Sequence, residues 1–133
     1  MSEPIHVLVV EDHPLNRELA EAILEREGYA VLSAPDGATA LAHAAATPFD
    51  VILMDVELPD MSGLEVTRQL KADPSTRAIP VVALTAYAMV GDEALARAAG
   101  CDDYVTKPIE RLKLLQAVKR ALAGAPVGAA ATA

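Results

Sequence analysis

The sequence is poor in aromatic residues and has almost no cysteine. Aromatic residues make up 3% of the 133 residues, tryptophan is absent, and the single cysteine, Cys101, has no partner for an internal disulfide. No apolar run approaches the roughly 20 residues that a membrane-spanning helix needs, and the N-terminal Met-Ser-Glu-Pro lacks the positive charge of a secretory signal. These absences predict a cytoplasmic protein with no direct membrane binding.

Basic residues are also scarce relative to acidic ones. The chain has 11 Lys and Arg against 19 Asp and Glu, a formal net charge of -8. Because nucleic acid is held mainly by Lys and Arg, this balance predicts no nucleic-acid partner and favours protein partners with basic or mixed surfaces. What the chain does contain is aliphatic: hydrophobic residues make up 53% of it, which is typical of helices packed on a parallel sheet.

Short apolar runs alternate five times with longer segments of helical period. The predicted strands lie at 5–10, 30–34, 51–54, 81–84 and 103–105. Helices are predicted at 14–27, from 37 onward, and at 63–71, 91–99 and 109–122. The runs at 5–10, 51–54 and 81–84 show little polar alternation, so we expect central strands covered on both faces. This alternation predicts an α/β fold with one parallel sheet and leaves the strand order open.

Large apolar residues at four-residue spacing predict which helix faces contact the core. In the first helix these residues are Leu15, Leu19 and Ile23. In the last helix they are Leu112, Leu115, Val118 and Leu122. After Leu122 the chain is rich in Ala and Gly with little large apolar surface. We therefore expect a folded domain over residues 1–123 and a flexible tail over residues 124–133.

Polar side chains follow four of the five predicted strands. Glu11 and Asp12 follow the first strand, Asp55 the third, Thr85 the fourth and Lys107 the fifth. Functional groups of an open parallel sheet gather at the carboxyl ends of its strands. If these strands are neighbours, three carboxylates, a hydroxyl and an ammonium converge at one edge of the sheet.

Three carboxylates in one pocket repel one another unless a cation neutralises them. Oxygen ligands favour Mg²⁺, with Asp12 and Asp55 as direct ligands and Glu11 holding a metal-bound water. The same group suits phosphoryl transfer, in which Asp55 would be the nucleophile, Lys107 would pair with one phosphoryl oxygen and Thr85 could donate to another. The residues thus predict a magnesium-dependent phosphoacceptor.

Four motifs occur in a specific order along the chain. They are Val-Val-Glu-Asp, Ile-Leu-Met-Asp-Val-Glu-Leu-Pro-Asp-Met-Ser-Gly, Ala-Leu-Thr-Ala and Tyr-Val-Thr-Lys-Pro. In these motifs the chain resembles response-regulator receiver domains over about residues 5–122, and single-domain regulators of the DivK type most of all. The resemblance implies a doubly wound, flavodoxin-like fold with five parallel strands in the order 2-1-3-4-5 and a cis bond between Lys107 and Pro108.

The resemblance also implies roles for individual residues. Asp55 would be phosphorylated by a histidine kinase or histidine phosphotransferase, and the backbone carbonyl of Glu57 would be a metal ligand. Thr85 would move toward the phosphoryl group and Tyr104 would turn inward, which changes a surface for a protein target near residues 86–99 and Tyr104. The protein would be a monomer or weak dimer with self-phosphorylation and autodephosphorylation only, rather than an enzyme with an external substrate.

Other hypotheses remain at this point. The chain could be the receiver fragment of a hybrid histidine kinase, because such receivers carry similar motifs. A phosphohydrolase with an aspartyl-phosphate intermediate would use Glu57 as general acid, but no cap insertion encloses a substrate. A flavin-binding module is disfavoured because no phosphate-cradling loop follows the first strand. Within the resembled family, positions Glu57 and Tyr87 tune the lifetime of the phosphoryl group, in a direction the sequence does not predict.

Overall fold

The computed structural model describes residues 4–86 and 91–124 and contains five β-α units. The strands are β1 (His6–Val10), β2 (Ala30–Ala34), β3 (Val51–Asp55), β4 (Val81–Thr85) and β5 (Asp103–Thr106). The helices are α1 (Pro14–Arg26), α2 (Gly37–Ala46), α3 (Gly63–Ala72), α4 (Asp92–Ala99) and α5 (Arg111–Leu122). Every predicted element is confirmed, and Asp55 and Thr85 now count as the last residues of their strands.

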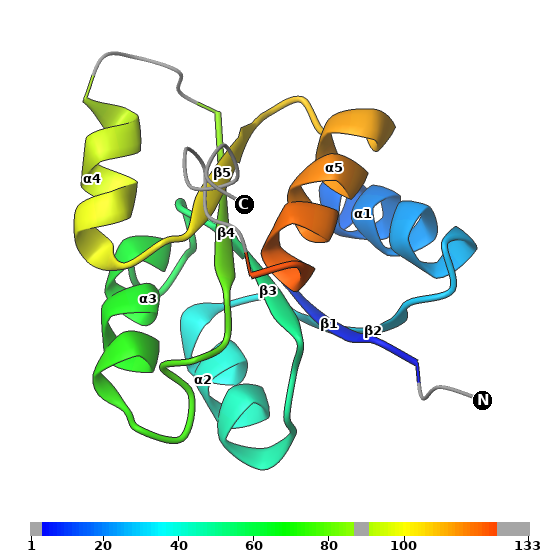
Figure 1. Ribbon diagram of the computed structural model, residues 1–133. Coiled ribbons are helices and arrows are strands. Elements are labelled where there is room, and N and C mark those ends of the chain that lie inside the picture. Colours follow the sequence, from blue (N-terminus) through cyan, green and yellow to red (C-terminus); the bar gives the residue numbers. More distant parts are fainter. Residues whose placement is uncertain (1–3, 87–90, 125–133) are drawn as a thin grey trace.

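The five strands form one sheet in the order β2-β1-β3-β4-β5, and every neighbouring pair is parallel. This is the order that the resemblance implied. Figure 1 shows α1 and α5 on one face of the sheet and α2, α3 and α4 on the other. The register places Asp55 opposite Leu84, and Thr85 opposite Thr106. The carboxyl ends of β3, β4 and β5 therefore lie side by side.

The core has two halves, one on each face of the sheet. In β1, Val7 and Val9 belong to the half beneath α1 and α5, whereas Leu8 and Val10 belong to the half beneath α2, α3 and α4. All residues of β3 and β4 are buried. Strands covered on both faces cannot alternate apolar with polar residues, which explains the continuous aliphatic runs in the sequence.

The predicted core face of α1 is wrong for two of its three residues. Leu15 is 70% exposed and Leu19 is 44% exposed, whereas Ile23 is buried. The buried face is instead centred on Ala20 and Leu24, both fully buried. A small side chain lets the helix approach the sheet closely, so the alanine faces the sheet and the two leucines turn away from it.

In α5 the predicted face is correct except at its first turn. Leu115 and Val118 are buried and Leu122 packs against the same core half, but Leu112 is 66% exposed. Leu112 is the second residue of a helix that begins beyond the carboxyl end of the sheet. The buried residues of this helix begin at Leu114, so Leu112 lies ahead of the face that contacts the core.

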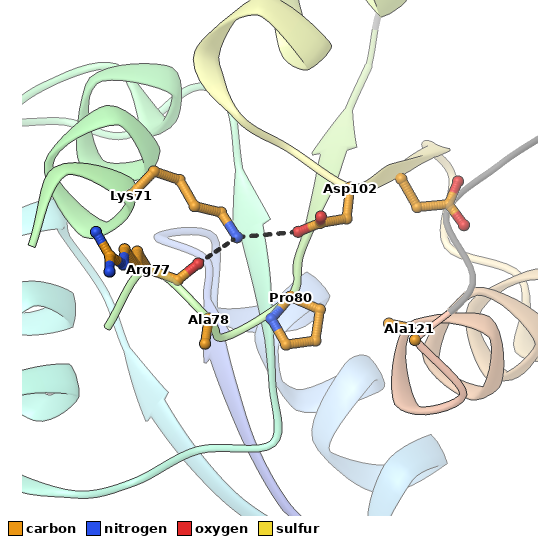
Figure 2. Close-up of a pocket in the computed structure, with 8 residues that line it drawn as sticks. Lys71, Arg77, Ala78, Pro80, Asp102 and Ala121 are labelled. Atoms are coloured by element: carbon orange, nitrogen blue, oxygen red, sulfur yellow. Dashed lines mark hydrogen bonds and ion pairs between the residues drawn. The ribbon is translucent and has the colours of Figure 1, made fainter. Parts of the chain in front are cut away.

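At the amino end of the sheet, Lys71 forms hydrogen bonds that connect several segments (Figure 2). Lys71 Nζ lies 3.1 Å from Asp102 Oδ2 and donates to the carbonyl oxygens of Arg77 at 3.2 Å and Ile79 at 2.7 Å. Asp102 Oδ2 also accepts the Val81 N–H at 2.8 Å. The ammonium thus joins α3 to the starts of β4 and β5 beside a pocket of about 280 Å³.

A second ion pair at this end holds α5 to β5. Arg120 Nε and Nη2 each lie 2.8 Å from Oδ2 of the buried Asp103. The other oxygen, Asp103 Oδ1, accepts the N–H of Tyr104 at 2.8 Å. Both oxygens of this buried carboxylate are therefore satisfied, as burial of a charge requires.

Three further expectations concern the chain as a whole. The bond between Lys107 and Pro108 is cis, as the resemblance implied. Within residues 4–86 and 91–124, no helix has the length and apolar character needed to cross a membrane. The expected tail lies outside the described residues except for Gly124, so the boundary after residue 123 stays a prediction.

Candidate functional site

Three carboxylates meet at the carboxyl ends of β1 and β3. Glu11, Asp12 and Asp55 each present an oxygen atom within 4.8 Å of the other two. Glu11 is fully buried and Asp55 is almost so, whereas Asp12 is exposed. The structure therefore brings together the acids that the sequence placed at neighbouring strand ends, with one side of the cluster open to solvent.

Lys107 reaches this cluster from the segment after β5. Its Nζ lies 3.0 Å from Asp55 Oδ2 and 2.8 Å from Glu11 Oε1. Burial on its own lowers the pKa of Lys107, but the contacts with Glu11 and Asp55 outweigh it, so the pKa is raised above its ordinary value. Lys107 is therefore a fixed positive charge that faces two carboxylates at once.

Glu11 carries the unbalanced charge of the site. Burial and the neighbouring Asp55 raise its pKa from 4.5 to about 7, against the lowering effect of Lys107 and of the His13 N–H. That N–H donates to Glu11 Oε2 at 3.1 Å. Oε1 lies 2.8 Å from Lys107 Nζ in an ion pair and has no other hydrogen-bond partner within the described part of the chain. With a pKa of about 7, Glu11 is partly protonated near neutral pH, and a bound metal ion could take the place of that proton.

Arg17 is a neighbour of the site that the sequence analysis missed. It lies in the first turns of α1, and its Nη1 donates to the backbone oxygens of Glu11 at 3.0 Å and Asp12 at 3.3 Å. These bonds hold the backbone of the loop that carries both acids. The signal was available: a long basic side chain five residues after Asp12 reaches back one turn to that loop.

The loop after β3 orients the Asp55 side chain. The Glu57 N–H donates to Asp55 Oδ1 at 2.9 Å, while the Glu57 side chain is exposed. The loop ends at Gly63, where a β-carbon would lie 1.9 Å from the Asp55 carbonyl oxygen. Only glycine fits this approach, so the chain returns directly against the backbone of Asp55.

Thr85 and Tyr104 lie beside a small cavity next to the cluster. The cavity measures about 90 Å³ and is lined by Val56, Leu64, Ala83, Thr85, Leu95, Ala96 and Tyr104. Thr85 is buried at the end of β4, and its carbonyl accepts the Lys107 N–H at 2.7 Å. Tyr104 is half-buried. Tyr87, which the resemblance marked as tuning the phosphoryl lifetime, lies outside the described residues.

The donor atoms of the cluster fit Mg²⁺. All are oxygens, three carboxylates share the site with one ammonium, and the buried Glu11 Oε1 has no hydrogen bond among the described residues. Mg²⁺ prefers oxygen ligands and usually takes only one or two carboxylates, keeping several waters. The exposed side at Asp12 leaves room for that arrangement.

Comparison with known proteins decides the family. Residues 7–119 match the family model of the response regulator receiver domain. The chain belongs to this family. The receiver is 43% identical over 122 residues to the polar-differentiation response regulator DivK of Brucella anthropi, covering 92% of this chain and 99% of that protein. The predicted family, fold and role in two-component signalling are thereby confirmed.

Solved structures resemble the receiver over nearly its whole length. The receiver domain of a sensor histidine kinase from Pseudomonas aeruginosa, solved with a magnesium ion coordinated in its active-site cleft, has a TM-score of 0.84 and 37% identity and covers 91% of this chain and 99% of that chain. Chemotaxis protein CheY4 of Vibrio cholerae has a TM-score of 0.86 and 31% identity, with 90% and 100% covered.

Proposed function

We propose that this receiver accepts a phosphoryl group on Asp55 from the phosphohistidine of a histidine kinase or histidine phosphotransferase. The position of Asp55 carries the proposal. Asp55 is the last residue of a fully buried strand. Its Oδ2 lies 3.0 Å from Lys107 Nζ, and its Oδ1 accepts the Glu57 N–H at 2.9 Å. A carboxylate fixed in this way is aligned before any phosphodonor arrives.

In the proposed reaction, a carboxylate oxygen of Asp55 forms a bond to phosphorus. The bond between phosphorus and the donor's imidazole nitrogen breaks, and its electron pair stays on that nitrogen. Lys107 offsets negative charge on the phosphoryl oxygens, and the Thr85 hydroxyl donates a hydrogen bond to one of them. The same residues would support slow self-phosphorylation from small phosphodonors and autodephosphorylation by water.

Asp12, Asp55 and the backbone carbonyl of Glu57 would hold Mg²⁺ directly, and Glu11 would hold one of its waters. The bound ion supplies positive charge that offsets both the acid cluster and the phosphoryl oxygens. Support comes from the 4.8 Å clustering of the three carboxylates and from the raised pKa of Glu11, which burial and the neighbouring Asp55 cause and which a bound cation would lower.

The proposed output is a change at the α4-β5 surface. Thr85 would move toward the phosphoryl group, and Tyr104 would turn into the cavity beside it. A protein target would then bind near residues 86–99 and Tyr104, where Leu95 is exposed; residues 87–90 of this stretch lie outside the described residues. Support comes from the shared cavity, since Thr85, Leu95 and Tyr104 all line it.

The proposal also covers domain organisation, location, oligomeric state and the class of partner. We propose a regulator of one domain, over residues 1–123, because the Brucella relatives are covered over 97% or more of their length. We also propose a cytoplasmic location and a monomeric or weakly dimeric state. The net charge of -8 supports protein partners over nucleic acid.

The test is incorporation of phosphate. Incubation with Mg²⁺ and acetyl phosphate should add one phosphoryl group by intact-mass spectrometry, and hydroxylamine should remove it, as expected of an acyl phosphate. Asp55→Asn should take up none. Asp50→Asn is the matched control because Asp50 directly precedes the amino end of the same strand, and it should behave as the unaltered protein. Uptake by Asp55→Asn, or by none of the three proteins, would contradict the proposal.

A further inference from the structure

The loop between β3 and α3 (residues 56–62) is fixed where it leaves the phosphoacceptor strand. Its Glu57 N–H donates to Asp55 Oδ1, and the Val56 N–H donates to the Leu84 carbonyl at 3.0 Å. The loop closes on itself where the Gly63 N–H donates to the Val56 carbonyl at 2.8 Å. An isolated antiparallel bridge also pairs Glu57 with Ser62. These contacts fix the two ends of the loop, and residues 58–61 between them are held by a further contact.

That contact is made by Asp60, which reaches the beginning of α2. Asp60 Oδ1 accepts the Gly37 N–H at 2.8 Å, and Oδ2 accepts the Ala38 N–H at 2.9 Å. The first N–H groups of a helix have no partners within it, and the helix dipole favours a negative charge there. The two bonds also lower the pKa of Asp60, which agrees with an ionised side chain in this place.

Packing beside these bonds is close. A β-carbon on Gly37 would lie 2.7 Å from Met61 Cγ and 2.8 Å from Val66 Cγ2. The loop therefore lies directly against the beginning of α2, and Gly37 leaves the room for it. Asp60 joins two surfaces that are already in contact.

The helix also has a cap from its own N-terminal residue. Asp36 is the N-cap of α2, and its Oδ1 accepts the Thr39 N–H at 2.7 Å. Asp60 comes from another part of the chain and takes the two remaining N–H groups ahead of Thr39. Of the two carboxylates at this helix end, Asp36 belongs to the helix, whereas Asp60 belongs to the loop that holds Asp55.

We propose that Asp60 is a positioning residue for the phosphoryl-transfer site. By tying the middle of the loop to α2, it keeps Glu57 in place, and Glu57 supplies both the N–H that orients Asp55 and the carbonyl proposed as a Mg²⁺ ligand. The inference rests on the proposed function for that ligand. Asp60 itself touches neither the metal nor the phosphoryl group.

The test compares two carboxylates at one helix end. Mg²⁺ affinity is measured by calorimetric titration with MgCl₂ for the unaltered protein, Asp60→Ala, Asp60→Asn and the matched control Asp36→Ala, and the melting temperature of each is recorded. Asp60→Ala should raise the Kd for Mg²⁺ about tenfold, the lower end of what loss of a supporting residue costs a metal site. Asp60→Asn keeps one acceptor oxygen and should give a smaller increase.

Asp36→Ala removes the N-cap bond and should also lower the melting temperature, while changing the Kd less than about twofold. Equal Kd increases in Asp36→Ala and Asp60→Ala, an unchanged Kd in both Asp60 variants, or an unaltered protein that binds no Mg²⁺ would overturn the inference. The proposed function fails separately: Mg²⁺ binding that depends on Asp60, without phosphoryl uptake from acetyl phosphate, would contradict phosphorylation and leave the positioning role standing.

Discussion

The two ends of the sheet each place a lysine against carboxylates, but they balance charge differently. At the amino end, Lys71 faces the single carboxylate of Asp102 and gives its remaining hydrogen bonds to two backbone carbonyls. At the carboxyl end, Lys107 faces Glu11 and Asp55 at once, with Asp12 in the same cluster. The amino end is complete as it stands. The carboxyl end lacks positive charge, and this deficit marks the functional site.

The largest difference between the ends should appear when each lysine loses its charge. Lys107→Met should slow phosphorylation by acetyl phosphate about a hundredfold, because the loss of one preorganised positive group at a transferring centre has effects of that order. Lys71→Met lies at the opposite end and should keep the original rate within about twofold. Intact-mass time courses measure both rates, and equal losses in the two variants would refute the distinction.

The second-largest difference between the two ends should be in how they make the stability of the protein depend on pH. The pKa of Glu11 is about 7 in the folded protein against 4.5 as its ordinary value, so the folded state holds this proton more tightly than the unfolded state. Without metal, the contribution of Glu11 to stability is fully present below pH 4.5 and is lost as the pH rises through about 7. The loss should be on the order of 3 kcal/mol.

Urea unfolding, followed by circular dichroism at several pH values, measures this slope. Glu11→Gln cannot ionise and should remove most of it, and saturating Mg²⁺ should remove it in the unaltered protein by replacing the proton. Asp102→Asn, at the amino end, should leave the slope in place. A slope that survives in Glu11→Gln would show that another group carries it.

At the amino end the effect should be on stability alone. Lys71→Met removes a donor to two carbonyls and one carboxylate, which should lower the free energy of unfolding by about 1–2 kcal/mol after allowance for the partial exposure of the pair. The midpoint of urea unfolding measures it. A stability equal to that of the unaltered protein would mean that solvent replaces all three bonds at no cost.

The smallest effect should come from an ion pair at neither end. Glu65 and Arg68 lie 3.3 Å apart on the surface of α3, both half exposed. Glu65→Gln should change the free energy of unfolding by less than about 0.5 kcal/mol, since exposed pairs are screened by water and salt. The same urea experiment compares this loss of unfolding free energy with that of Lys71→Met. A comparable loss in both variants would mean that Lys71 contributes no more to stability than an exposed ion pair does.

The strands and the site residues could be predicted because both depend on local sequence. A strand buried on both faces must be continuously apolar, so 51–54 and 81–84 were recognisable. The residue that follows such a run lies at the sheet edge, which brought Asp55 and Thr85 to the site. Strand order came from the resemblance alone, because apolar periodicity contains no information about which strands are neighbours.

Helix orientation and supporting contacts were not predictable in the same way. Leu15 and Leu19 marked the wrong face of α1, because close packing against the sheet selected the small Ala20 instead. Asp60 was visible in the motif Leu-Pro-Asp-Met-Ser-Gly, but its role depends on Gly37 and Ala38, which come together with it only in the folded chain. Spacing along the sequence gives no sign of such a contact.

The cavity between Thr85 and Tyr104 has a consequence for small-molecule binding. It holds about 90 Å³, and the exposed Leu95 in its lining leaves it open to solvent on one side. A side chain that fills it therefore displaces water from a mostly apolar lining. A small apolar compound that occupies the cavity should exclude the Tyr104 ring from it, and NMR of that ring should detect the exclusion without a kinase, a metal ion or any covalent change.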